Sequence, residues 1–175
     1  MVTKTRWFER AFEFHFPIGV FPCIIERLRG TPARCEELIR SFPPKILTIQ
    51  INNTWSIQEH VGHLYDLDEL HVGRVDDFLS HEKVLRPTDV RNKKTYDAHH
   101  NAVPIQTLLR QFREARQHFV HRLELLDEEQ AALVAEHPRL RQPMRLVDMA
   151  YFVAEHDDHH LARMTELAKL LKKNH

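Results

Sequence analysis

The sequence predicts an all-α protein, specifically an antiparallel four-helix bundle with long connections and one or two short extra helices. Apolar residues recur at steps of three and four along four long segments, which is the spacing of amphipathic helices. The 175 residues include only four glycines, too few for a sheet protein with many tight turns. The length fits one domain, expected over residues 1–175 with its core at about 17–171.

The first two helices are predicted from apolar spacing and from helix-end signals. The first covers about 17–41 and should be bent or in two parts, because the Gly-Thr-Pro sequence at 30–32 combines a helix stop, an N-cap and a first-turn proline. Ser56 and Glu59 have the capping-box spacing, so the second helix should begin there and run to about His81.

The second half of the chain contains a long connection and two further long helices. Residues 82–103 show no sustained period, and connections of this length are often functional. The third helix should begin near Pro104. Asp127 and Gln130 indicate a second capping box and a short helix, and the last helix is expected at about 145–173.

The composition excludes several classes of function. Lys plus Arg and Asp plus Glu both total 25, so no net positive field favours a nucleic-acid partner or an anionic membrane. Charges interrupt the N-terminal stretch where a secretion signal needs apolar residues, and no segment reaches the ~18 apolar residues of a membrane span. We therefore expect a cytoplasmic protein whose two cysteines, Cys23 and Cys35, are reduced.

The 14 histidines are the unusual feature of the composition. The apolar stripe of the last helix contains Met149 and Val153 and then reaches His156 and His160, one turn apart on the same face. Two buried imidazoles need partners, and this spacing allows both rings to bind one metal ion. The string HDDHH lacks the glutamate of the HExxH metalloprotease motif, so a zincin mechanism is not supported.

A third ligand should come from a facing helix, as is usual for sites in helix bundles. The second helix offers His60, His63 and His71, and spacing alone does not choose among them. A carboxylate-bridged di-iron site is disfavoured, because it needs Glu-x-x-His pairs and the chain has aspartates at Asp68 and Asp157 in the corresponding places.

Two segments of the sequence resemble the DinB-like family: residues 55–64 (WSIQEHVGHL) and 154–162 (AEHDDHHLA). The similarity covers about 17–171. The family consists of four-helix bundles, often dimeric, that hold a divalent ion on three histidines. Its first ligand lies eight residues after the tryptophan that precedes the second helix, which corresponds here to His63. The other two form the HxxxH pair, which corresponds to His156 and His160.

The resemblance implies one divalent transition metal, zinc, nickel or iron, on a site with an open coordination position. It also implies a homodimer and a metal-dependent enzyme acting on a small-molecule substrate, either a thiol S-transferase that uses a low-molecular-weight thiol or a small-substrate hydrolase. The alternative is a non-enzymatic metal-binding or stress-response module, in which the ion stabilises the bundle.

Several polar residues near these motifs have two interpretations each. Glu59 and Glu155 could orient ligand rings, but we expect a cap and a surface carboxylate. Tyr96, His99 and His100 either cover the pocket and contact a substrate or form a polar surface loop, and His159 lies beside the site or is simply solvated.

Overall fold

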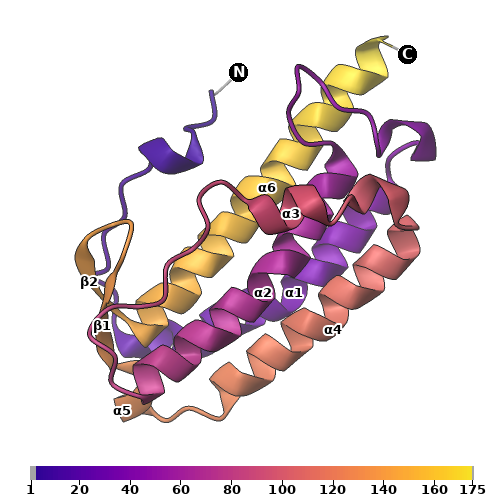
Figure 1. Cartoon of the computed structure of the whole chain (residues 1–175). Coiled ribbons are helices and arrows are strands. Elements are labelled where there is room, and N and C mark those ends of the chain that lie inside the picture. The colour runs from indigo at the N-terminus through magenta and orange to yellow at the C-terminus, as the bar shows by residue number, and fades with distance from the viewer. Residues whose placement is uncertain (1–2, 175) are drawn as a thin grey trace.

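The computed structural model describes residues 3–174. Its four long helices are α1 (Phe21–Arg40), α2 (Ile57–Leu79), α4 (Ile105–Glu124) and α6 (Leu146–Asn174). Helices α1 and α6 run in one direction, and α2 and α4 run in the opposite direction (Figure 1). The predicted all-α four-helix bundle is therefore confirmed.

Short elements join the long helices. Two are α-helices, α3 (Lys93–Asp97) and α5 (Glu128–Ala131), and the described 3₁₀ helices are Trp7–Glu9, Ile18–Val20, Pro44–Ile46 and His100–Ala102. Strands β1 (Val134–His137) and β2 (Gln142–Arg145) form an antiparallel hairpin before α6. This hairpin was not predicted, because the strands are short and Pro143 lies inside β2. A proline is tolerated there, since β2 lies at the edge of the two-stranded sheet.

The start of α2 follows the predicted capping box. The Ser56 hydroxyl accepts a hydrogen bond from the Glu59 backbone N–H at 3.1 Å, and the Glu59 carboxylate accepts one from the Ser56 N–H at 2.7 Å. These bonds satisfy donors that have no partner within the helix. The helix ends at Leu79, two residues before the predicted limit.

Helix α1 is continuous through Pro32, so the predicted two-part form is wrong. A proline inside a helix removes the N–H that would bond the carbonyl four residues earlier, which here belongs to Leu28. The Arg116 guanidinium lies 3.4 Å from that carbonyl oxygen and donates to it through Nη1. A side chain from α4 thus replaces the missing donor.

The apolar core is divided into two clusters. One contains residues from the hairpin end of every long helix, including Leu28, Phe78 and Val153, and the other lies at the opposite end and includes Phe112 and Met164. Between them, a belt of buried polar side chains crosses all four helices. We call it the polar belt: Thr31, His63, Asp68, His71, Arg116, His156, Asp157 and His160.

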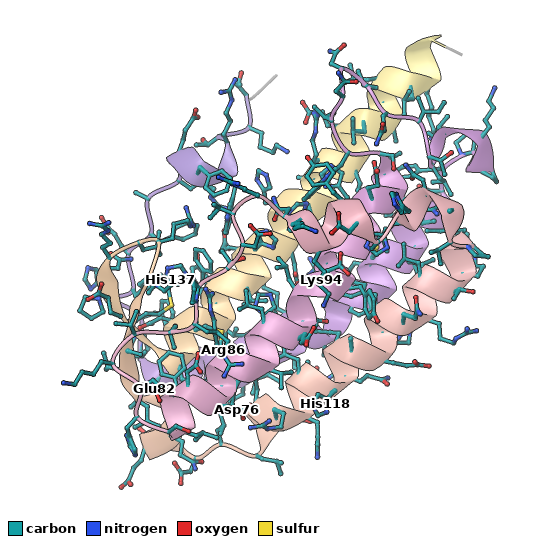
Figure 2. All side chains as sticks on the ribbon, viewed as in Figure 1. Asp76, Glu82, Arg86, Lys94, His118 and His137 are labelled. Carbon is teal, nitrogen blue, oxygen red and sulfur yellow. The ribbon has the colours of Figure 1, made fainter. Side chains whose placement is uncertain are left out.

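The long connection between α2 and α4 returns the chain to the other end of the bundle (Figure 1), which is why these two helices run in parallel. It is anchored to α2 by Arg86, which forms an ion pair with Asp77 at 2.7 Å, and by Lys94, which pairs with Glu69 at 2.6 Å. Figure 2 labels Arg86 and Lys94 on this connection. Within residues 3–174, no helix combines the length and the apolar character needed to cross a membrane.

Candidate metal centre

Three histidines meet in the polar belt. His63 comes from α2, and His156 and His160 come from adjacent turns of α6. One ring nitrogen from each lies within 4.8 Å of the others. Their exposed fractions are 4%, 9% and 6%. The structure therefore brings together the residues that the family resemblance selected.

The three rings line a cavity of about 1200 Å³. Its wall near the histidines is aromatic: the Trp55 ring centroid lies 4.5 Å from that of His63, and the Trp7 centroid lies 4.9 Å from that of His156. Trp7 belongs to the N-terminal segment, which lies to one side of α6 (Figure 1) and packs on it through the Trp7 contacts with Phe152 and His156. Indole rings therefore contact two of the three imidazoles.

A chain of hydrogen bonds orients the His63 ring. Its Nδ1 lies 3.2 Å from the Thr95 hydroxyl oxygen, and that hydroxyl donates to Asp66 at 2.8 Å. Because the Thr95 proton goes to Asp66, the Thr95 oxygen accepts from Nδ1. His63 therefore carries its proton on Nδ1, which leaves the Nε2 lone pair free for a ligand bond. His100 also contacts Asp66, with Nε2 at 2.8 Å from the carboxylate.

The two α6 histidines contact each other and one further imidazole. His160 Nδ1 lies 2.8 Å from His60 Nδ1, and His160 Nε2 lies 3.0 Å from His156 Nε2. His156 Nδ1 is buried without a partner among the described residues. Several imidazole nitrogens that lie close together and lack hydrogen-bond partners are better suited to coordinate a shared cation than to hydrogen-bond to one another.

Burial keeps these rings neutral at neutral pH. Removal from water lowers the pKa of His63 to about 4 and that of His60 to about 3, and it lowers the pKa values of His156 and His160 well below their usual range. An imidazole binds a metal only in its neutral form. The donor set therefore fits a divalent transition metal.

The other two candidates for the third ligand, His60 and His71 on α2, lie outside the three-histidine cluster. His60 touches His160 but is not one of the three clustered residues. His71 lies further along α2, with its ring centroid 5.6 Å from that of Phe119, and its Nδ1 has no partner among the described residues.

Most neighbouring residues have the structural roles that we expected. Glu59 closes the capping box and also accepts from Gln50, and Glu155 forms ion pairs with Arg10 and Arg27. His99 and Tyr96 are exposed. Two candidates lie closer to the histidines, because His100 is buried against Asp66 and His159 lines the cavity.

Sequence reasoning missed Thr95 and Asp66, the residues that orient His63. Asp66 lies almost one helical turn after His63, so its spacing was a usable signal. Thr95 lies in the aperiodic connection, and no local pattern places it beside α2.

Substituting Gly62 by alanine is expected to disturb the hydrogen bonds around Asp66, which orient the His63 ring through Thr95. A Cβ at position 62 would overlap the imidazole ring of His100, so the ring must shift, which disturbs its 2.8 Å contact with Asp66. We expect a loss of about 1–3 kcal/mol in the free energy of unfolding, typical of overpacking. The measurement is urea denaturation followed by circular dichroism.

Gly30→Ala is the matched control, because Gly30 is also inside a helix and a Cβ there meets no atom within 4 Å. This variant should gain about 0.5–1 kcal/mol from its better helix propensity. Equal effects of the two substitutions would contradict the close contact at Gly62.

The fold and the imidazole cluster define the class of protein: a four-helix bundle whose polar middle layer presents three neutral histidines to one cavity. The sequence matches the DinB superfamily over residues 27–164, and the chain belongs to this superfamily. This match confirms the resemblance in residues 55–64 and 154–162.

A solved structure with the same fold is YfiT from Bacillus subtilis, described as a probable metal-dependent hydrolase with an unusual four-helix bundle topology. The TM-score is 0.78, the sequence identity is 19%, and the match covers 93% of this chain and 94% of YfiT. The likeness at this identity shows the shared fold. No curated protein sequence gives a significant match to the chain.

Proposed function

We propose that the protein binds one divalent transition metal through His63, His156 and His160 and acts as a metal-dependent hydrolase of a small substrate. The observation that carries this proposal is the meeting of three neutral imidazole nitrogens, within 4.8 Å of one another, on the wall of a large cavity. Three histidine ligands leave a coordination position open, whereas structural sites are closed by a fourth protein ligand.

The residues around the histidines suit this role. A divalent ion held by three histidines supplies a Lewis acid and lowers the pKa of water near it. Thr95 and Asp66 hold the proton of His63 on Nδ1, and His60 can accept the proton that His160 carries on Nδ1. The description of YfiT supports hydrolysis as the reaction class.

Metal analysis tests the ligands directly. Protein purified without a His-tag should contain one zinc, nickel or iron ion per chain, measured by inductively coupled plasma mass spectrometry. His156→Ala and His160→Ala should abolish binding, because each removes one of three ligands. The control is His118→Ala, since His118 is exposed on α4. Full occupancy in the His156 or His160 variant would exclude the proposed ligand set.

Activity measurements then separate an enzyme from a non-enzymatic module. The metal-loaded protein is screened with small esters and amides, and separately with thiols and electrophiles for the transferase chemistry of the family. Turnover that a chelator removes supports an enzyme. A protein whose melting temperature depends on the ion, but which turns over no substrate in either screen, is the metal-stabilised alternative.

A further inference from the structure

The cavity is lined by several residues with a buried nitrogen atom that has no hydrogen-bond partner within residues 3–174. Among the described residues, four buried side-chain atoms have no hydrogen-bond partner, and all four are nitrogens of residues that line this cavity. They are Trp55 Nε1, His71 Nδ1, His156 Nδ1 and Arg139 Nη2. The indole and guanidinium nitrogens can only donate. A ligand rich in acceptors would complement this wall.

The charged groups of the lining point to the same kind of ligand. The basic lining residues are Lys4, Arg6, Arg74, Arg139, Arg163 and Lys169, and the acidic ones are Asp89 and Glu166. Glu166 already pairs with Lys4 and Arg163. Within residues 3–174, Arg74 and Arg139 form no ion pair.

Arg74 is buried and held in one orientation. Its Nε and Nη2 donate to the Arg86 carbonyl at 3.2 and 3.1 Å, which leaves Nη1 directed elsewhere. The nearest acidic influence is Asp77, whose carboxylate oxygens are bound by Arg86. Burial lowers the pKa of Arg74 to about 10, so its charge remains at neutral pH.

His137 places a second donor in front of Arg74. Its Nδ1 accepts from the backbone N–H groups of Arg139 and Leu140, at 3.3 and 3.2 Å, so the ring proton must lie on Nε2. His137 Nε2 lies 3.3 Å from Arg74 Nη1, and two N–H donors therefore face each other. An oxygen that accepts from both would remove this conflict.

Arg139 adds a second guanidinium beside an aromatic surface. Its Cζ lies 5.5 Å from the Phe152 ring centroid and 5.8 Å from that of Trp7. These rings continue to the histidines: centroid separations are 5.1 Å from His137 to Phe152, 5.0 Å from Phe152 to Trp7 and 4.9 Å from Trp7 to His156. Figure 2 shows His137 at the hairpin end of the bundle.

We propose that Arg74, His137 and Arg139 form a subsite for the carboxylate of a small organic acid with an apolar, aromatic body. The carboxylate accepts hydrogen bonds from the two guanidinium groups and from His137 Nε2. Hydrogen bonds between a guanidinium and a carboxylate are charge-assisted and therefore stronger than those between neutral groups. The body lies along Phe152 and Trp7, and its far end reaches the three histidines. As a statement about substrate class this inference rests on the proposed function, but carboxylate binding itself needs no metal.

The test is isothermal titration of chelator-treated protein with phenylacetate, with phenylacetamide and inorganic phosphate as comparison ligands. The absence of metal ensures that the carboxylate is not bound by an ion. We expect phenylacetate to bind about tenfold more tightly than phenylacetamide, because the amide lacks the charge that the arginines pair with. Equal affinity of acid and amide, or tighter binding of phosphate, would overturn the carboxylate subsite.

Arg139→Gln should weaken phenylacetate binding by about tenfold. Arg163→Gln is the matched control, since Arg163 lines the same cavity but is paired with Glu166. Equal weakening by both variants would indicate attraction by general charge and overturn the subsite. Circular dichroism verifies that each variant folds. Metal content is measured in parallel, so a failure of carboxylate binding and a failure of the three-histidine site are distinguished.

Discussion

Metal-free protein should unfold on acidification between about pH 5 and pH 6, before most carboxylates titrate, because buried histidines are held neutral. Burial lowers the pKa of His60 and His137 to about 3 and that of His63 to about 4. It also lowers the pKa values of His71, His156 and His160 well below their usual range.

The sign follows from proton uptake. In the unfolded chain these histidines have a pKa of about 6.5, so below that pH the unfolded state binds protons that the folded state does not. Stability is complete above the unfolded pKa, falls as the pH decreases, and stops falling near the folded pKa. One pH unit below about 6.5, each histidine costs about 1.4 kcal/mol. Six of them together cost about 8 kcal/mol, which is comparable with the whole stability of a domain, about 5–15 kcal/mol.

Urea denaturation of chelator-treated protein at about pH 7.5, 6.5 and 5.5 measures this loss, and the slope of unfolding free energy against pH counts the protons. His71→Leu should reduce the slope by about one proton, because His71 is buried and lies outside the three-histidine cluster. His118→Gln and His121→Gln replace exposed histidines on α4 and should leave the slope unchanged. Constant stability over this pH range would show that the buried rings are protonated in the folded protein.

The four helices and their starts could be predicted because their signals are local. Apolar spacing defines each buried face, and the capping boxes at Ser56 and Asp127 are present where the sequence indicated. The hairpin was not predictable in this way, since strands of four residues have too short a period. The two-part alternative for α1 was wrong, because the donor that replaces the Pro32 N–H comes from Arg116, far away in the sequence.

The candidate site could be predicted only in part, for the same reason. His156 and His160 lie on one face of one helix, so spacing alone pairs them. The choice of His63 on α2 required the resemblance to a family. Thr95 contacts that ring across 32 residues of chain, and Trp7 reaches His156 from the N-terminal segment. Such contacts depend on the tertiary fold and leave no periodic signal.

Arg116 holds the largest buried charge network in the polar belt. The guanidinium is 1% exposed and bonds both Asp68, with Nη2 at 2.9 Å from Oδ1, and Asp157, with Nη2 at 3.1 Å from Oδ1. One cation is shared by two carboxylates, so the network has one negative charge in excess when both are ionised. Burial raises the pKa of Asp68 to about 7, which identifies Asp68 as the carboxyl that is readily neutralised.

Arg116→Met should therefore cost about 3–5 kcal/mol in the free energy of unfolding, because it leaves two buried carboxylates without a cation and the Leu28 carbonyl without its donor. Asp68→Asn should cost much less, since Arg116 and Asp157 remain as a neutral pair. Arg122→Met is the matched control on the same helix: its ion pair with Asp76 is solvent-exposed and should contribute at most about 1 kcal/mol. Urea denaturation at neutral pH measures all three. If Asp68→Asn destabilises the protein as much as Arg116→Met does, the excess negative charge is not the property that governs this network.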